Sequence, residues 1–141
     1  MAKILVVDDQ FGVRSLLVEL FRGDHHEVKT AENGEEALRL FRAFEPDLIL
    51  MDMKMPGMNG IEALEKIRTI DRQVAVIMMT AYGETNQNKE QTKALGVLYY
   101  MDKPFDLFEL REHVKAILNS SGIIARRTYK LIEIRTIAKL F

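Results

Sequence analysis

The chain has 141 residues, 48% of them hydrophobic, and a formal net charge of −1 at pH 7, a composition that predicts one globular domain and argues against intrinsic disorder. It contains no cysteine, which excludes disulfides, thiolate metal sites and a cysteine nucleophile and agrees with a reducing, cytoplasmic location. The apolar run at residues 4–7 is too short for a signal peptide or a membrane span, so we expect no membrane partner.

Five strand–helix pairs follow one another along the chain. From the N-terminus they are predicted at 3–7 with 11–23, 27–31 with 34–44, 47–51 with 59–70, 73–79 with 84–95, and 97–101 with 106–118. Apolar or alternating runs are typical of strands, and apolar residues every three to four positions are typical of helices. Strands that alternate with helices predict a doubly wound α/β fold, in which helices cover both faces of a five-stranded parallel sheet.

Two of the predicted helices have clear local signals. The segment 11–23 has five apolar side chains at helical spacing, which are Val13, Leu16, Leu17, Leu20 and Phe21. Asn33 comes directly before the second helix, 34–44, where its side chain can accept a backbone hydrogen bond as the N-cap. The fourth helix, 84–95, is unusually polar.

The last residues differ in charge from the rest of the chain. Residues 120–141 hold five basic side chains against one acid, so they carry +4 and leave −5 for the remainder. An acidic main body argues against nucleic acid as its partner. The segment follows a Ser-Ser-Gly break and is partly amphipathic, so we divide the chain into a domain at 1–119 and a basic tail at 120–141. We expect this tail to pack on its own domain, to pack on a second subunit, or to be disordered. Binding to a membrane surface or to a partner helix is a less simple alternative.

Polar side chains interrupt the apolar runs where the predicted strands end. Asp8 and Asp9 follow the first strand, Asp52 the third and Thr80 the fourth, and Lys103 follows the fifth. The carboxyl ends of parallel strands meet at one edge of a sheet, and ligands of open α/β sheets bind there. The sequence therefore predicts that these five side chains converge.

Three converging carboxylates would repel one another strongly without a cation. Oxygen ligands of this kind suit Mg²⁺, which binds a few carboxylates and keeps waters and phosphate oxygens in its shell. The Thr80 hydroxyl and the Lys103 ammonium could hold the other oxygens of a phosphoryl group. Asp52 would then be the nucleophile that attacks phosphorus.

Each of these residues also has an ordinary structural interpretation. Asp8 or Asp9 could be a helix N-cap, and Asp52 could cap the turn that follows it. Thr80 could be a strand-end hydroxyl, and Lys103 a solvated loop charge. That all five should fall on one edge by chance is the weaker hypothesis.

The motifs VVDDQ, LILMDMKMPGMNG, MMTAYGE and YYMDKPF resemble those of the receiver domain of bacterial two-component response regulators. The resemblance covers residues 3–118 and implies a flavodoxin-like (βα)5 fold with strand order 2-1-3-4-5. Within this family the chain is most similar to single-domain regulators of sporulation phosphorelays.

The resemblance implies a role for each acid of the cluster. Asp52 is the phosphoacceptor and a metal ligand. Asp9 binds Mg²⁺ directly, Asp8 assists through water, and the backbone carbonyl of Lys54 completes the protein ligands.

The resemblance also implies a set of residues that respond to the phosphoryl group. Thr80 contacts it through the hydroxyl, Lys103 pairs with one of its oxygens, and the Lys103-Pro104 peptide bond is cis. Tyr100 occupies the aromatic switch position, although Tyr99 is a rival because the segment before Lys103 is one residue longer than in similar relatives.

Three further positions are expected to tune hydrolysis of the acyl phosphate, which are Gln10, Lys54 and Tyr82. Lys54 and Tyr82 stand two residues after Asp52 and Thr80, beside the path of an attacking water. Long side chains there can block or misplace the water, which predicts a long-lived phosphoprotein.

These roles imply a phosphorelay response regulator. Asp52 would accept a phosphoryl group from the phosphohistidine of a histidine kinase in a Mg²⁺-dependent step. The signal would leave by onward transfer to a histidine phosphotransferase or by phosphorylation-dependent binding of a regulator. We expect a phosphotransfer protein that slowly dephosphorylates itself rather than a turnover enzyme, acting as a monomer or weak dimer. The first helix should dock the partner, through some of Val13, Arg14, Leu17 and Leu20.

Two alternatives belong to other classes. One is a DNA-binding response regulator that uses the basic tail, which the short tail and acidic body disfavour. The other is a haloacid-dehalogenase-type phosphatase, which also uses an aspartate nucleophile and Mg²⁺. Its D-x-D motif would place an acid where this chain has Lys54.

Overall fold

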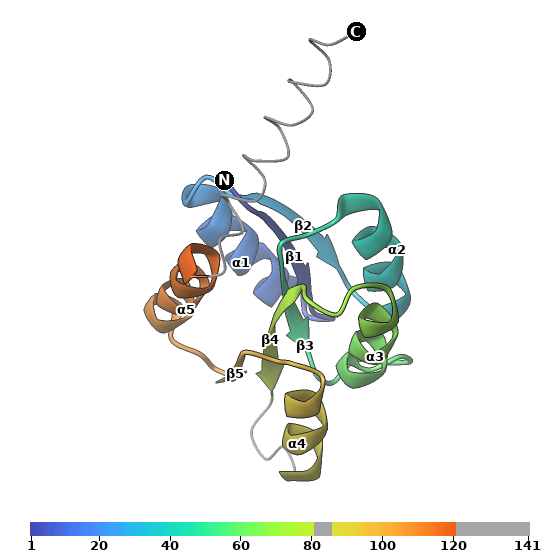
Figure 1. Cartoon of the computed structure of the whole chain (residues 1–141). Helices are drawn as coiled ribbons and strands as arrows, with labels where there is room; N and C mark the ends of the chain where they lie inside the picture. Colours follow the sequence, from blue (N-terminus) through green and yellow to red (C-terminus); the bar gives the residue numbers. More distant parts are fainter. Residues whose placement is uncertain (81–85, 121–141) are drawn as a thin grey trace, which may run out of the picture.

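The computed structural model describes residues 1–80 and 86–120, and in these ranges five strands alternate with five helices (Figure 1). The strands are β1 (Lys3–Val7), β2 (Glu27–Ala31), β3 (Leu48–Asp52), β4 (Ala75–Thr80) and β5 (Tyr99–Asp102). The helices are α1 (Phe11–Gly23), α2 (Gly34–Phe44), α3 (Gly60–Ile70), α4 (Asn86–Ala94) and α5 (Leu107–Ser120). Tyr82 and the predicted tail after residue 120 lie outside the described residues.

All five strands are parallel, in the order β2-β1-β3-β4-β5. The predicted fold class and strand order are therefore confirmed. β1 lies between β2 and β3, so Ile4 pairs with Val28 on one side and with Leu48 on the other. The chain winds outward in both directions from the β1–β3 pair, and a doubly wound sheet binds ligands beyond the carboxyl ends of such a pair.

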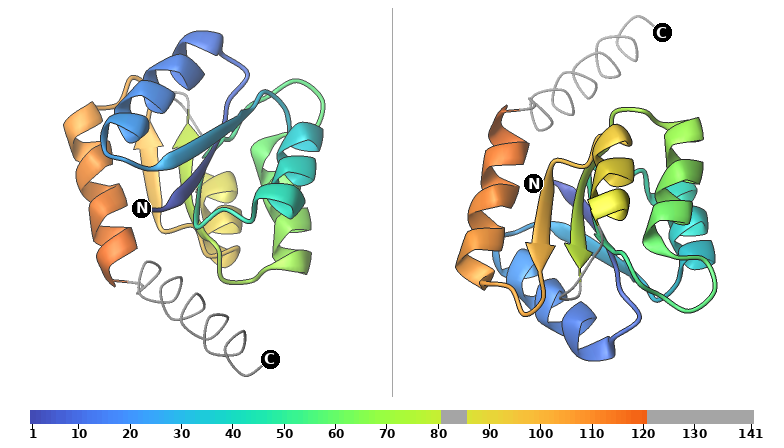
Figure 2. Two further views of the ribbon diagram at one scale, coloured as in Figure 1. Left: turned by 90° about the horizontal axis from the view of Figure 1, so that it is seen from above. Right: turned by 90° about the horizontal axis from the view of Figure 1, so that it is seen from below.

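Alternate residues of the strands face two separate layers of helices. Ile4 packs in a cluster with Leu17 of α1 and with apolar side chains of α5. Its neighbour Leu5 packs in a second cluster with Phe41 of α2 and Leu64 of α3. Figures 1 and 2 show α1 and α5 over one face of the sheet and the other three helices over the opposite face. Burial on both faces explains the continuous apolar runs in the sequence.

Strand β4 begins at Ala75, later than the predicted start at residue 73. The reason is a turn in front of it, in which the Asp71 carboxylate accepts the N–H groups of Gln73 (2.7 Å) and Val74 (3.1 Å). Backbone groups bonded in this way cannot pair with a neighbouring strand.

Strand β5 begins at Tyr99 rather than at residue 97, because the Val97 N–H still donates to the Thr92 carbonyl at the end of α4. The strand runs on to Asp102, one residue beyond the predicted end. Asp102 therefore lies at the carboxyl edge of the sheet, directly before Lys103.

The helix predictions are correct in location. Asn33 caps α2, and its side chain accepts the Glu36 N–H at 2.8 Å. In α1, Leu17 is fully buried whereas Leu16 is 43% exposed. Successive helical residues are about 100° apart around the axis, so only one of the two leucines can face the sheet. Leu17 is consequently a core residue and is not available to a docking partner.

None of the helices in the described ranges combines the length and the apolar composition needed to cross a membrane.

Candidate functional site at the carboxyl edge of the sheet

Asp52 is the last residue of a strand in which every residue is buried, and it is itself only 4% exposed. The β3–β4 pairing continues just past it, since the Met53 N–H donates to the Met79 carbonyl at 2.9 Å. The Asp52 backbone is therefore fixed within the sheet. Its carboxyl group stands at the edge where β1 and β4 also end.

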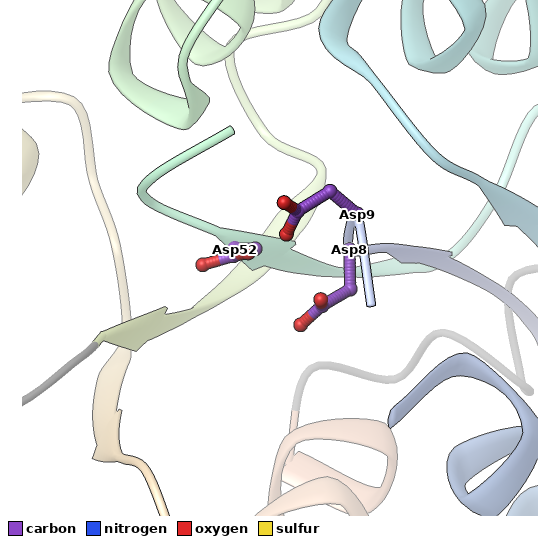
Figure 3. A group of neighbouring side chains, drawn as sticks. All are labelled: Asp8, Asp9 and Asp52. Carbon is purple, nitrogen blue, oxygen red and sulfur yellow. The ribbon is translucent and has the colours of Figure 1, made fainter. Parts of the chain in front are cut away.

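Asp8 and Asp9 approach Asp52 from the end of β1. Each of the three acids offers a carboxylate oxygen, and these oxygens lie within 4.8 Å of one another. Figure 3 shows the three side chains directed toward a common region. Asp8 is fully buried and Asp9 is exposed. The structure thus brings together the acids that the sequence predicts to converge.

The alternative in which Asp8 or Asp9 caps α1 is wrong, because Gln10 occupies the N-cap position. The Asp8 carboxylate instead accepts the Gln10 N–H at 2.8 Å, which orients the carboxylate in front of the helix. Arg14 of the first helical turn donates to the Asp8 backbone carbonyl at 2.8 Å. α1 is therefore joined to the acidic cluster by backbone and side-chain contacts.

Lys103 supplies a positive charge to this cluster from beyond β5. Its Nζ lies 2.6 Å from Asp8 Oδ2, 3.4 Å from Asp52 Oδ2 and 3.5 Å from Gln10 Oε1. Only 19% of the side chain is exposed. The interpretation of Lys103 as a solvated loop charge is therefore wrong. The Lys103-Pro104 bond is cis, as predicted.

The pKa of Asp52 is raised from its ordinary 3.8 to about 7, and burial of the carboxyl group is the largest cause. The negative charge of Asp8 and a hydrogen bond with Asp9 contribute to this rise, while the Lys103 ammonium and the Lys54 N–H oppose it. A lysine alone therefore does not keep Asp52 fully ionised at neutral pH, and an additional cation would favour the ionised form.

Replacing Asp52 with asparagine should stabilise the metal-free protein at alkaline pH. Because the folded-state pKa of Asp52 is raised, the folded protein binds a proton that the unfolded chain releases between about pH 4 and 7. Wild-type stability therefore falls as pH rises through this window. Asparagine cannot ionise, so the gain should be small at pH 4 and reach about 2 to 4 kcal/mol at pH 8.

Urea unfolding in EDTA at several pH values measures this gain in the free energy of unfolding. Glu19→Gln makes the same acid-to-amide change at an exposed position of α1, and its stability difference from wild type should not follow this pH dependence. A gain that is equal at pH 4 and pH 8 would mean that ionisation of Asp52 is not its source.

Thr80 ends β4 at the same edge and is fully buried. Its hydroxyl donates to Asp102 Oδ1 at 2.9 Å. Thr80 lies where the sequence predicts it, but the predicted strand stops at residue 101, so no function is predicted for Asp102. A signal was available, since Asp102 is also a polar residue that follows an apolar run.

The two tyrosines of β5 face opposite sides of the sheet. Tyr100 belongs to the α2–α3 side and donates its hydroxyl to the Lys89 carbonyl of α4 at 3.2 Å. Tyr99 stacks on His113 of α5, with ring centroids 4.0 Å apart. Tyr100 is thus the tyrosine that contacts α4.

Three predicted residues are expected to tune hydrolysis, and the structure describes two of them, Lys54 and Gln10. Lys54 is exposed, and its backbone N–H lies 3.3 Å from Asp52 Oδ1, so its backbone stands beside the phosphoacceptor candidate. Gln10 contacts Lys103 as described above. Tyr82 lies outside the described residues.

Gly60, the first residue of α3, supports the site without bearing a functional group. A Cβ atom on Gly60 would lie 2.2 Å from the Asp52 carbonyl oxygen and 3.0 Å from Met53 Cα. The Gly60 N–H also donates to the Met53 carbonyl at 2.9 Å. The start of α3 is therefore packed directly against the backbone of Asp52, and this requirement for glycine is not visible in the sequence.

The acidic cluster fits a hard divalent cation such as Mg²⁺, which prefers carboxylate oxygens. Asp8, Asp9 and Asp52 are close enough to share one ion. The raised pKa of Asp52 indicates that positive charge is in short supply here. The ion would compete with Lys103 for two of these carboxylates.

Comparison with known proteins agrees with this arrangement. The family model of the response regulator receiver domain matches residues 4–115. Sporulation initiation phosphotransferase F of Bacillus subtilis is 48% identical over 116 residues, which are 82% of this chain and 93% of the relative. Chemotaxis protein CheY of Halobacterium salinarum is 36% identical over 121 residues, which are 85% of this chain and the whole of the relative.

Longer proteins and solved structures are similar as well. Regulatory protein AtoC of Escherichia coli is 42% identical over 116 residues, but this chain spans only 25% of its length. The crystal structure of a response regulator receiver domain protein from Clostridium thermocellum superposes with a TM-score of 0.79 at 31% identity, covering 88% of this chain and 99% of that one.

Proposed function

This chain belongs to the response regulator receiver family, and from that premise we propose that it is a phosphorelay protein in which Asp52 accepts a phosphoryl group from phosphohistidine. The observation that carries this proposal is a buried carboxylate at the end of β3, 3.4 Å from the Lys103 ammonium and grouped with two further acids.

The proposed transfer is an in-line displacement at phosphorus. An Asp52 carboxylate oxygen forms a bond to phosphorus, the phosphorus–nitrogen bond of the donor histidine breaks, and the electron pair returns to the imidazole. Lys103 would neutralise a phosphoryl oxygen, and the Thr80 hydroxyl would donate to another. A bound Mg²⁺, held by Asp8, Asp9, Asp52 and the Lys54 carbonyl, would supply positive charge for the phosphoryl oxygens.

Family membership favours this function over the phosphatase alternative. The haloacid-dehalogenase-type phosphatase belongs to another family, and Lys54 stands where such an enzyme would need its second acid. A DNA-binding role would depend on the basic tail, and a gel shift with duplex DNA tests it. For the aromatic switch we propose Tyr100, because it contacts α4 whereas Tyr99 packs on α5.

We propose a histidine kinase as the donor and a histidine phosphotransferase or regulator as the recipient. The similarity to Sporulation initiation phosphotransferase F supports a cytoplasmic relay that leads to sporulation. Phe11, the first residue of α1, is 73% exposed, and Leu16 of the same helix is 43% exposed, so these two replace Leu17 as docking candidates. The protein would work as a monomer or weak dimer.

The experiment that tests this function is phosphotransfer profiling. Each histidine kinase of the host is phosphorylated with labelled ATP, purified from nucleotide and mixed with the protein and Mg²⁺. Label should move within seconds from one kinase to this chain and be released by hydroxylamine, as expected for an acyl phosphate. Label that resists hydroxylamine, or no transfer from any kinase, would count against the proposal.

Lys54→Asn should shorten the lifetime of the phosphorylated protein. The Lys54 side chain would stand beside the path of the attacking water, and an asparagine amide could instead orient that water. We expect hydrolysis about tenfold faster, equivalent to about 1.4 kcal/mol of barrier. The measurement is the decay of labelled protein at pH 7.5 with Mg²⁺. Lys66→Asn makes the same change on the exposed side of α3 and should leave the lifetime unchanged, whereas equal rates in both variants would contradict the blocking argument.

We further propose that residues 1–119 form the receiver domain and that 120–141 is a separate basic tail. The apolar cluster between the sheet, α1 and α5 includes Leu118 as its last residue. α5 itself continues to Ser120. A chain that ends at Asn119 should therefore fold and accept phosphate at the wild-type rate, and loss of labelling in a folded truncated chain would show that the tail helps to form the site.

A further inference from the structure

The Thr80 hydroxyl has a partner that leaves it unavailable to a phosphoryl group. A hydroxyl carries a single hydrogen to donate. That hydrogen is directed at Asp102 Oδ1, 2.9 Å away, and Thr80 is fully buried. Buried hydroxyl groups keep a hydrogen-bond partner because an unpaired one is costly. The Thr80 hydroxyl can therefore leave Asp102 only when another acceptor is present.

The order of the strands shows the direction in which Asp102 holds this hydroxyl. β4 lies between β3, which carries Asp52, and β5, which carries Asp102. Thr80 and Asp102 are partners in the β4–β5 register, whereas Asp52 is the register partner of Met79 on the other side of β4. The Thr80–Asp102 bond therefore draws the hydroxyl toward β5, away from the strand that bears the phosphoacceptor.

We propose that Asp102 is a positioning residue that restrains the Thr80 hydroxyl, so that phosphorylation of Asp52 must break the Thr80–Asp102 hydrogen bond. This inference rests on the proposed function. Because one hydrogen cannot serve both acceptors, each phosphoryl-bound molecule has lost the bond to Asp102. Asp102 is exposed, so its released carboxylate is hydrated. The Thr80–Asp102 hydrogen bond nevertheless stabilises only the unphosphorylated protein. It therefore lowers the fraction of molecules in the phosphorylated state.

The test measures binding of trifluoroberyllate, a tetrahedral phosphoryl mimic that adds to a carboxylate oxygen, in the presence of Mg²⁺. Isothermal titration calorimetry gives its dissociation constant for the full-length protein. Asp102→Ala removes the acceptor, so we expect about tenfold tighter binding, equivalent to about 1.4 kcal/mol. Asp102→Asn keeps an oxygen acceptor and removes the charge, so its affinity should stay within about threefold of wild type.

A double-mutant cycle shows whether the effect passes through the hydroxyl. Thr80→Val has nearly the same shape but no hydrogen to donate. If Asp102 acts by restraining Thr80, Asp102→Ala should change the affinity of Thr80→Val by less than about twofold. A tenfold gain that persists without the hydroxyl would overturn the proposal, because the carboxylate would then act by repulsion through space. Equal gains in Asp102→Ala and Asp102→Asn would overturn it for the same reason.

The outcome separates failure of this inference from failure of the proposed function. If wild-type protein binds trifluoroberyllate but Asp102→Ala binds no tighter, the restraint is absent while the phosphoacceptor assignment stands. If wild-type protein neither binds trifluoroberyllate nor accepts label from acetyl phosphate, the phosphoacceptor assignment fails, and the inference fails with it.

Discussion

Asp52→Asn should abolish phosphorylation. The wild-type protein incubated with labelled acetyl phosphate and Mg²⁺ should gain one phosphoryl group, bound as a hydroxylamine-sensitive acyl phosphate. An asparagine amide has a neutral, poorly nucleophilic oxygen, so no bond to phosphorus should form. We expect the labelling rate to fall by at least about a thousandfold, which corresponds to roughly 4 kcal/mol of barrier. Intact-protein mass spectrometry and autoradiography at matched times measure the change.

Two controls make this result specific to Asp52. The variant should be at least as stable as wild type at pH 8, so loss of label cannot be attributed to unfolding. Asp71→Asn makes the same substitution outside the acidic cluster, in the turn before β4, and should label at the wild-type rate. Undiminished labelling of Asp52→Asn at another residue would refute the phosphoacceptor assignment.

Gly60→Ala should destabilise the protein more than a glycine-to-alanine substitution at any other glycine that the structure describes. The new Cβ would meet the Asp52 carbonyl oxygen at 2.2 Å and two further backbone atoms at 3.0 Å. Backbone atoms of a central strand cannot rotate away as a side chain can, so α3 must shift or β3 must deform. We expect a loss of about 3 kcal/mol or more in the free energy of unfolding, measured by urea unfolding.

A series of glycines provides matched controls for this loss. Gly23 has no atom within 4 Å of the added Cβ, so Gly23→Ala should be neutral or stabilising by up to about 1 kcal/mol. Gly34→Ala would meet two side-chain atoms of Met58 at 2.8 Å, which can partly move, and the Met58 carbonyl oxygen at 2.9 Å, so its cost should fall between the two. Equal stability of the Gly60 and Gly23 variants would contradict the close packing of α3 against Asp52.

The sequence predicted the topology well because two independent signals agreed. Apolar runs located all five strands, and the segments between these runs had apolar residues at helical spacing. The sheet order followed from the family resemblance. The polar residues at strand ends were placed correctly for the same reason, since the end of an apolar run is visible in the sequence. Asp8, Asp9, Asp52 and Lys103 were thus grouped before any distance was known.

Features that depend on a specific neighbour were not visible in the sequence. Asp102 was missed because the predicted fifth strand ended one residue too early, and because its partner, the Thr80 hydroxyl, lies on another strand. The need for glycine at residue 60 depends on the distance to another element. The helical spacing of apolar residues in α1 did not distinguish the exposed Leu16 from the buried Leu17, because this spacing does not define how wide the buried face of a helix is.

The long separation of the site residues along the chain has a consequence for biosynthesis. Asp8 and its partner Lys103 are 95 positions apart, so on the ribosome Asp8 and Asp52 both emerge well before the lysine that neutralises them. Until the last strand joins the sheet edge, the clustered carboxylates have no ammonium to offset their repulsion and their burial is costly. Contacts of such separation also slow folding. This acidic site is therefore among the last parts of the domain to be completed, and a nascent chain forms the whole site only after almost all of the domain has been synthesised.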